Sequence, residues 1–385
     1  MCSMSLRRNR ISVFTAALLC AVTTGIVHSP VASATPGSPV TGAGWSFRVS
    51  SVPAGVNSGG ELAFDATRRA LFITDNDFVM STKGGTDVSF DPHVVRPKVT
   101  VFSIDKRRPV RSIDFTPQPW GMMPVGNAPI IPTPQVPDGI SLDTKRGQLV
   151  VSNSHANGIT VVGMKATTTS AANLIAVPNT HPMGSVVDTA AGRAYVALNN
   201  AARVAVVSTV TGRKISEIGG IKWPSFVDLD AKRHRLYVGN ADYLTKKTNY
   251  LTVVDTRTDK IVKRIATPSN TRPKVDPATG RVFAASFDTG KIVVIDPDSL
   301  TIIKTVQTHS SPNKLAIDAQ RRLVYTADLQ KRTITVLDAD TAKVVATVPT
   351  NAPVHTIAVD PRTGAVYGTQ HQSGRLTILS VARAH

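Results

Sequence analysis

A repeat of about 42 residues constrains the fold of this chain more than any other feature. Seven aspartates each end a short apolar segment, and successive members are 78, 45, 42, 46, 42 and 42 residues apart. The seven are Asp65, Asp143, Asp188, Asp230, Asp276, Asp318 and Asp360. A period of this length is typical of repeat architectures in which each repeat is one supersecondary unit.

A second position of the repeat lies seven residues after each aspartate. It is occupied by Phe72, Val150, Tyr195, Tyr237, Phe283, Tyr325 and Tyr367, each inside an apolar segment. In the five repeats without an insertion at this point, an alternating strand pattern ends 13 residues later. In every repeat but the seventh, a polar turn and a fourth strand follow. Four strands per repeat predict a propeller blade, and we expect each aspartate to accept backbone N–H groups in the turn that follows it.

The two ends of the chain predict how the ring closes. The seventh repeat lacks a fourth strand, whereas residues 45–52 form an orphan strand before the first repeat. Pairing the two removes exposed sheet edges. The sequence therefore predicts an all-β fold, a seven-bladed β-propeller of four-stranded antiparallel blades over residues 45–385, closed by the N-terminal strand completing the last blade.

The first 34 residues read as a secretory signal peptide, followed by a short tail over 35–44. A basic stretch precedes an apolar run from Ile11 to Val27, which is too short for a good membrane span, and small residues at 32–34 offer a cleavage site. Both cysteines, Cys2 and Cys20, lie in this segment, so we expect no disulfide in the mature chain. The predicted location is secreted, or associated with the cell wall, and the choice between the general and twin-arginine export routes stays open.

The repeats resemble the YVTN-type propeller repeat, which is WD40-like in its layout, and the chain is similar to YncE-like proteins. Tyr195-Val-Ala-Leu-Asn199 and Tyr237-Val-Gly-Asn240 carry the resemblance, together with Leu251-Thr-Val-Val-Asp255. It covers residues 45–381. The resemblance implies an exported propeller of mostly uncertain role, in a family with some members implicated in nucleic-acid binding or in surface layers. Blade 2 departs from the pattern, with Val150 for tyrosine and Gly163 for the last aspartate.

Three insertions map to one face of the predicted ring. We call this the top face: it holds the connections between blades and those between second and third strands, and the bottom face holds the other turns. Insertions lie between Phe72 and Asp105, between Asp105 and Asp143, and between Tyr237 and Asp255. Long loops on a rigid scaffold are where binding commonly resides.

The first two insertions each leave two interpretations open. The proline-rich connector 116–137 around Trp120 either presents a contact surface or packs over the junction of blades 1 and 2. The other loop contains acids that either bind calcium or are solvated turn residues. These residues are Asp75, Asp77, Asp87, Asp91 and His93.

A ring of polar residues is expected at the top mouth of the central channel, where each first strand begins. Its members are Glu61, Asp138, Met183, Ser225, Arg272, Lys314 and His355, with Asn153, His155 and His371 in neighbouring loops. The ring either binds a ligand or lines a water-filled channel.

Basic residues are in excess, and the formal charge of +18 falls to +15 when the signal is removed. On the top face, Lys246 and Lys247 lie near Tyr243 and Trp223 in sequence, in a pattern suited to single-stranded nucleic acid. Bottom-face pairs such as Arg68-Arg69 and Arg321-Arg322 are interpreted as solubilising turn charge.

These patterns favour a binding or scaffold protein that engages a polyanion, either nucleic acid or a cell-wall polymer, or a surface partner through its top face. The alternative is a propeller enzyme, a lyase or hydrolase similar to streptogramin lyases, with His355, Glu61 and Asp138 as its catalytic residues. No motif for a metal, cofactor or nucleophile is found. We expect a monomer without a cofactor or a transmembrane segment.

Overall fold

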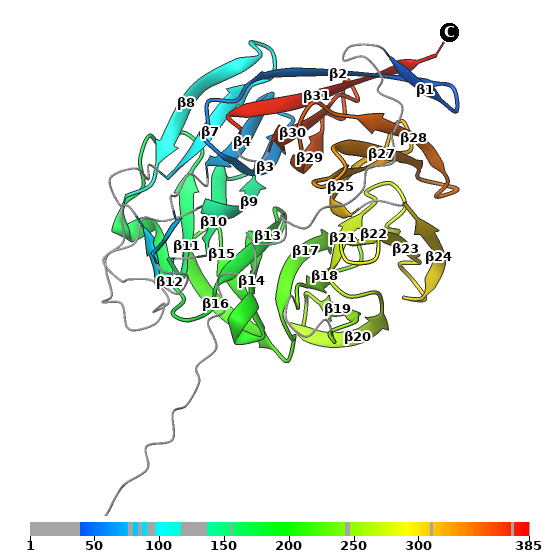
Figure 1. Cartoon of the computed structure of the whole chain (residues 1–385). Helices are drawn as coiled ribbons and strands as arrows, with labels where there is room; N and C mark the ends of the chain where they lie inside the picture. Colours follow the sequence, from blue (N-terminus) through cyan, green and yellow to red (C-terminus); the bar gives the residue numbers. More distant parts are fainter. Residues whose placement is uncertain are drawn as a thin grey trace, which may run out of the picture.

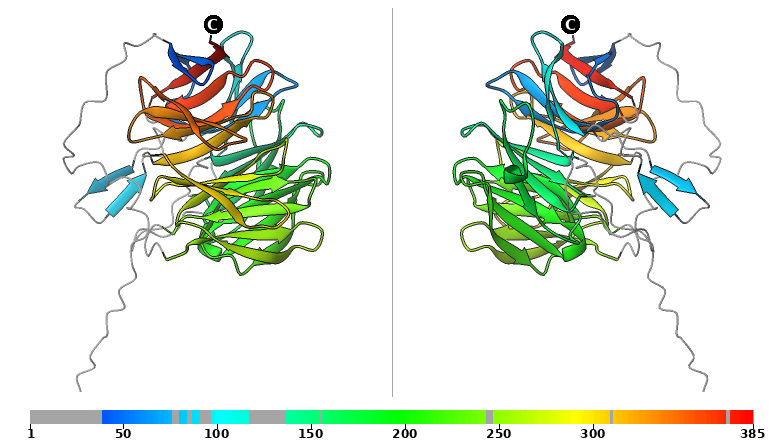
Figure 2. Two further views of the ribbon diagram at one scale, coloured as in Figure 1. Left: turned by 90° about the vertical axis from the view of Figure 1, so that its right-hand side faces the viewer. Right: turned by 90° about the vertical axis from the view of Figure 1, so that its left-hand side faces the viewer.

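The computed structural model describes residues 39–75, 80–83, 87–90, 97–116, 137–154, 156–242, 247–308, 311–370 and 373–384, with the backbone alone at 80–83 and 87–90. Seven antiparallel sheets, six of four strands and one of five, stand in a ring around a central channel (Figure 1). Figure 2 shows the ring from two sides. The chain is thus a seven-bladed β-propeller, as the repeat predicts. Among the described residues, no helix is long and apolar enough to cross a bilayer.

Each of blades 1 to 6 is a meander whose strands pair in chain order, with the first strand at the channel (Figure 1). Blade 1 contains β3 (Gly59–Asp65), β4 (Ala70–Asp75), β7 (Lys98–Ser103) and β8 (Arg108–Asp114). Blade 2 contains β9 (Pro137–Asp143), β10 (Gln148–Asn153), β11 (Gly158–Gly163) and β12 (Leu174–Ala176). Blade 3 contains β13 (Pro182–Asp188), β14 (Arg193–Leu198), β15 (Arg203–Ser208) and β16 (Arg213–Gly219).

The next three blades repeat this order with few irregularities. Blade 4 contains β17 (Pro224–Asp230), β18 (Arg235–Asn240), β19 (Tyr250–Asp255) and β20 (Lys260–Ala266). Blade 5 contains β21 (Thr271–Val275), β22 (Val282–Ser286), β23 (Lys291–Ile295) and β24 (Ile302–Gln307). Blade 6 contains β25 (Pro312–Asp318), β26 (Leu323–Asp328), β27 (Thr333–Asp338) and β28 (Val344–Pro349).

Blade 7 combines the two ends of the chain, which confirms the predicted closure. Its inner strands are β29 (Val354–Val359), β30 (Val366–Gln370) and β31 (Arg375–Arg383), and its fourth strand is β2 (Trp45–Pro53). β2 pairs with β31 over nine residues, and Phe47 is fully buried in the core between blades 6 and 7. The segment that we assigned to a short tail contains β1 (Val40–Gly42), which pairs with β2 as a fifth strand.

The repeat aspartates are buried and organise the turn after each first strand, as expected. In every blade one carboxylate oxygen accepts a backbone N–H from two or three residues further on, as in Arg68 N to Asp65 Oδ1 at 3.0 Å and Arg362 N to Asp360 Oδ1 at 3.0 Å. The residue four positions after each aspartate has a positive φ, between 52° and 80°. The aspartate therefore builds a turn that requires one left-handed residue.

An arginine contacts the neighbouring turn at six of the seven junctions on the bottom face, and at the remaining one, between blades 3 and 4, His234 is exposed. At four junctions an arginine three residues after the aspartate packs across the left-handed glycine of the next blade. These pairs are Arg68 with Gly147, Arg146 with Gly192, Arg233 with Gly280 and Arg321 with Gly364. At the other three, the left-handed position itself holds the large residue and the preceding blade a smaller one. These are Arg69 after Thr363, His234 after Ala191 and Arg322 after Thr279.

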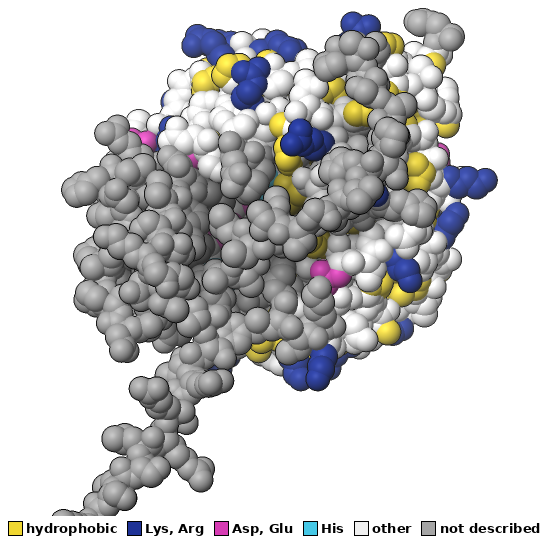
Figure 3. All heavy atoms as spheres, in the orientation of Figure 1, with side chains coloured by type: hydrophobic (Ala, Val, Ile, Leu, Met, Phe, Trp, Pro, Cys, Tyr) yellow, Lys and Arg dark blue, Asp and Glu magenta, His cyan; other side chains and the backbone are white. Residues whose placement is uncertain are grey.

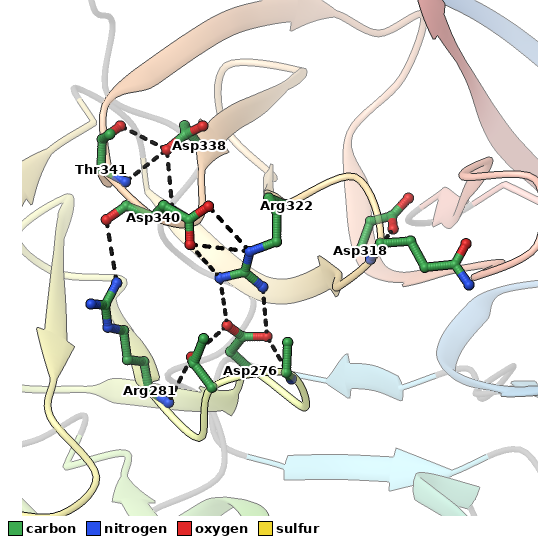
Figure 4. Close-up of polar contacts among 10 residues, drawn as sticks. Asp276, Arg281, Asp318, Arg322, Asp338, Asp340 and Thr341 are labelled. Carbon is green, nitrogen blue, oxygen red and sulfur yellow. Dashed lines mark hydrogen bonds and ion pairs between the residues drawn. The ribbon is translucent and has the colours of Figure 1, made fainter.

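These arginines pair with the buried repeat aspartates, and two of them do so across a junction. Arg322 lies 2.9 Å from Asp276 of blade 5 and also pairs with Asp340 (Figure 4). Arg69 lies 2.8 Å from Asp360 of blade 7. The bottom-face arginines, which we interpreted as solubilising charge, thus neutralise buried carboxylates and connect blades.

The described part of the first insertion projects from one face of the ring. Between β4 and β7 the chain forms a hairpin of β5 (Met80–Lys83) and β6 (Asp87–Phe90), which projects from one face of the ring (Figure 2). The connector around Trp120 lies outside the described residues. Blade 2 is less regular, because β12 has three residues and Thr167 and Thr169 instead bond with Asp114 at the end of β8.

Candidate functional site

The central channel opens on the top face into a cavity of about 170 Å³. The residue four positions before the repeat aspartate lines it in all seven blades: Glu61, Gly139, Gly184, Phe226, Arg272, Lys314 and Thr356. Six of the seven first strands carry a β-bulge at this point, β21 being the exception. A bulge redirects side chains locally, so neighbouring positions face the channel in different blades.

The expected polar ring is only partly assembled at this mouth. Glu61, Arg272 and Lys314 line the cavity, and Asp138 and Met183 join them from bulged positions. Ser225 is fully buried and instead accepts a hydrogen bond from Asn199 Nδ2 at 2.7 Å. The His355 side chain lies beside Glu61, with its Nδ1 3.4 Å from the carbonyl oxygen of Gly60.

One wall of the cavity is cationic and is built on blades 5 and 6. The guanidinium carbon of Arg272 lies 4.3 Å from the ring centre of Phe226 and 5.0 Å from that of Phe287, and Arg272 is 5% exposed. Lys314 Nζ lies 4.7 Å from the centre of the same Phe226 ring. Two cations thus share one aromatic ring, whose face attracts positive charge.

Acidic residues from blades 1, 2 and 4 face this wall, and two of them are paired. Glu61 Oε1 lies 3.0 Å from Lys314 Nζ, and Glu61 Oε2 accepts a hydrogen bond from Thr356 Oγ1 at 3.2 Å. Asp228 pairs with Lys274 at 3.3 Å and accepts the backbone N–H of Val275 at 2.7 Å. Asp138 is the third acid of the lining.

The environment of Glu61 keeps it ionised. Burial raises its pKa, but the charges of Lys314 and His355 and the hydrogen bonds outweigh burial and hold the pKa below its ordinary value. A general acid needs a pKa near the working pH, which usually means a raised pKa for a carboxyl group. Glu61 is therefore poorly suited to donate a proton in the alternative catalytic assignment.

The remaining candidates are placed away from the cavity lining or outside the described residues. Asn153 is fully buried, and its Nδ2 donates to Thr160 Oγ1 at 2.9 Å. Trp223 has a left-handed backbone whose carbonyl accepts the N–H of Ala241, and Lys247 is exposed. The candidates that lie outside the described residues are Trp120, His155, Tyr243, Lys246 and His371.

Three residues of the site were not identified from the sequence: Phe226, Phe287 and Asp228. The repeat contained a signal for two of them, because Phe226 and Asp228 stand four and two positions before Asp230. Phe287 follows β22 on the top face, and its ring contacts Arg272 of the neighbouring strand β21.

Comparisons with known proteins agree with the fold. No family model matches the chain. Two proteins described as uncharacterized YncE proteins, from Salmonella typhi and Salmonella typhimurium, are each 29% identical over 93 residues, or 24% of this chain. The match spans 25% of the length of these curated relatives.

Solved propellers superpose on most of the chain. The β-propeller domain of Cps50 (Swd1) from Myceliophteria thermophila has a TM-score of 0.64 at 12% identity, covering 86% of this chain and 98% of that one. Hydrazine synthase of Kuenenia stuttgartiensis also has a TM-score of 0.64, at 14% identity, with coverage of 86% and 97%. At such identities the likeness shows the fold alone. The chain is thus a seven-bladed β-propeller with local similarity to YncE.

Proposed function

We propose that the protein is an exported binding module that engages a phosphate-bearing polymer, either nucleic acid or a cell-wall polymer, through the basic half of its top face. Exposed cations on blades 4 to 6 support the proposal. Lys247 follows β18, Lys291 begins β23, and Lys331 and Arg332 lie between β26 and β27. Figure 3 views this side of the molecule and shows Lys and Arg side chains around its described part.

The cations at the channel mouth carry the proposal. Arg272 and Lys314 at the channel mouth extend the positive surface of blades 5 and 6 toward the centre. A basic surface attracts phosphates with little dependence on sequence.

A charge-reversal experiment tests this function. The variant Lys247→Glu, Lys291→Glu, Lys331→Glu is compared with a bottom-face control of equal net charge, Lys145→Glu, Lys232→Glu, Lys343→Glu. Binding of a single-stranded oligonucleotide and of polyglycerol phosphate is measured by fluorescence anisotropy over a range of salt. We expect the top-face variant to bind at least about tenfold more weakly, with a salt slope lower by about two to three.

The bottom-face control should bind within about twofold of the parent protein, because a change of net charge alone acts weakly at a distance in salt. Equal losses in both triple variants, or no binding of either polymer at low salt, would contradict the proposal. If the parent protein binds one of the two polymers more tightly, that difference identifies nucleic acid or cell-wall polymer as the preferred ligand class.

A further inference from the structure

We propose that the cavity at the channel mouth binds a small zwitterion of the amino-acid type, with its carboxylate at Arg272 and Lys314 and its ammonium group at Asp138. This site goes beyond polymer binding, because it lies inside the channel mouth and not on the exposed rim. Three features of the cavity support it: two cations, Arg272 and Lys314, on one wall; the acid Asp138 on the opposite wall; and a small volume.

The cationic wall is suited to a carboxylate. The guanidinium group of Arg272 is nearly buried between the rings of Phe226 and Phe287, and its Nη1 donates to the Asn270 carbonyl at 3.3 Å. Stacking on two rings fixes the plane of a guanidinium group, whose fork of N–H donors matches a carboxylate. Lys314 lies over the same Phe226 ring and already pairs with Glu61, so it would add a second, shared contact to a carboxylate bound by Arg272.

The opposite wall offers one acid that is not paired with a lysine or arginine among the described residues. Glu61 and Asp228 are each paired with a lysine. The Asp138 carboxylate, by contrast, lines the same cavity without a lysine or arginine partner in the described part of the chain; its charge acts on His181, an imidazole whose pKa is lowered by burial. A half-enclosed carboxylate gains most from a charged donor. Because its neighbours are already neutralised, Asp138 is where an ammonium group would bind.

The dimensions of the cavity favour a small ligand. Its volume of about 170 Å³ is below the roughly 300–1,000 Å³ typical of sites for drug-sized ligands. Gly139 and Gly184 keep neighbouring first strands in close approach, since a Cβ at Gly139 would lie 2.3 Å from the Met183 carbonyl oxygen. Leu62, Ile140 and Met183 also line the cavity and would contact an apolar side chain.

A ligand series on the full chain tests the proposal. The twenty free amino acids are screened by thermal shift, and the tightest binder is compared by calorimetry with its N-acetyl and amide derivatives. We expect each derivative, which lacks one of the two charges, to bind at least about tenfold more weakly. Absence of binding by every amino acid up to about 10 mM, or equal affinity for all three forms, would overturn the proposal.

Two variants assign the ends of the ligand. Asp138→Asn, which preserves shape, should weaken the amino acid about tenfold and remove the preference over the N-acetyl form. Arg272→Met should remove the preference over the amide form. Asp298→Asn, at an acid that is 77% exposed on the bottom face, is the matched control and should change neither affinity. Unchanged selectivity in Asp138→Asn would overturn the assignment even if Arg272→Met fails to fold.

The two proposals fail independently of each other. The top-face charge reversal leaves the cavity lining intact, so it should abolish polymer binding while amino-acid affinity stays within about twofold. Conversely, Asp138→Asn should lose its amino-acid selectivity while its polymer binding is unchanged, which would show that the two sites act independently.

Discussion

At the residue scale, the repeat aspartates show why a basic chain can bury so many carboxylates. All seven are at most 7% exposed, and each accepts a backbone N–H in its own turn. Six of them also lie within 3.0 Å of an arginine, either in their own blade or from the next one. A buried charge is tolerated when it is both paired and hydrogen-bonded, and these residues meet both conditions. These six arginines therefore serve the fold.

The buried tyrosines make stability depend on alkaline pH, and Tyr237 gives a test. Its hydroxyl is buried with no hydrogen-bond partner among the described residues, and burial, with the nearby charge of Asp230, raises its pKa to about 12. An unfolded tyrosine has a pKa near 10, so the unfolded state loses this proton first as pH rises. The free energy of unfolding therefore keeps its full value with respect to Tyr237 below pH 10, and it falls as pH rises from 10 toward 12.

We expect Tyr237→Phe to remain within about 1 kcal/mol of the parent at pH 7, because no hydrogen bond is lost. Phe72 and Phe283 already occupy the equivalent position in blades 1 and 5. Between pH 7 and pH 11 the variant should lose about 1 kcal/mol less unfolding free energy than the parent. Urea unfolding at the two pH values measures this, and an identical alkaline loss would show that Tyr237 does not contribute.

At the element scale, the turns that join first and second strands determine how blades meet. Six of the seven junctions contain an arginine, supplied either by the preceding turn or by the left-handed position of the following one. Where an arginine arrives from the preceding blade, the left-handed position is a glycine, since a side chain there would occupy the same space. The residue at the left-handed position of one blade is thus matched in size to the side chain from the turn of the preceding blade.

Gly280→Ala tests this matching against Gly44→Ala, a control with nearly the same backbone angle. Gly280 has a φ of +80° and a Cβ there would lie 2.2 Å from Arg233 Nη1, whereas Gly44 has a φ of +78° and open space around it. We expect the control to cost about 1 kcal/mol, because only the left-handed backbone is penalised. Gly280→Ala should cost about 2–4 kcal/mol in chemical unfolding, because Arg233 must leave the buried Asp230. Equal losses of unfolding free energy in the two variants would show that Gly280 is not required to accommodate Arg233.

At the scale of the whole molecule, closure of the ring depends on a strand from the opposite end of the chain. β2 covers the edge of β31, and Phe47 fills the core between blades 6 and 7. Without this strand, blade 7 would expose both a row of unpaired backbone groups and apolar surface. Exposed edges of this kind promote association with other chains.

A chain beginning at residue 54 should therefore melt about 10 °C or more below the parent and self-associate, because β2 and the Phe47 contacts are lost. A chain beginning at residue 40, which retains β1 and β2, is the control and should melt within about 2 °C of the parent. Thermal unfolding and light scattering after size-exclusion chromatography measure both effects. A monomeric product with an unchanged melting temperature would refute the role of β2 in closure.

The sequence by itself was sufficient to predict the blade number, the four strands of the regular blades, the closure by residues 45–52 and the function of the repeat aspartates in their turns. Each of these depends on short-range or periodic features: strand alternation, a fixed offset of seven residues, or a turn within four residues of Asp65 or Asp318. Periodicity also places the insertions on one face, because connections of the same kind meet at the same end of every blade.

Only the tertiary structure decided which side chains share the channel mouth and which cations are neutralised. The bulges bring Asp138 into the cavity lining while Ser225 bonds to Asn199, although both were expected in the same ring. Arg322 neutralises Asp276, a residue 46 positions away, and Glu61 meets Lys314 across the ring closure. Such contacts depend on side-chain direction at a bulge and on the packing of one blade against another, and a repeat pattern contains neither.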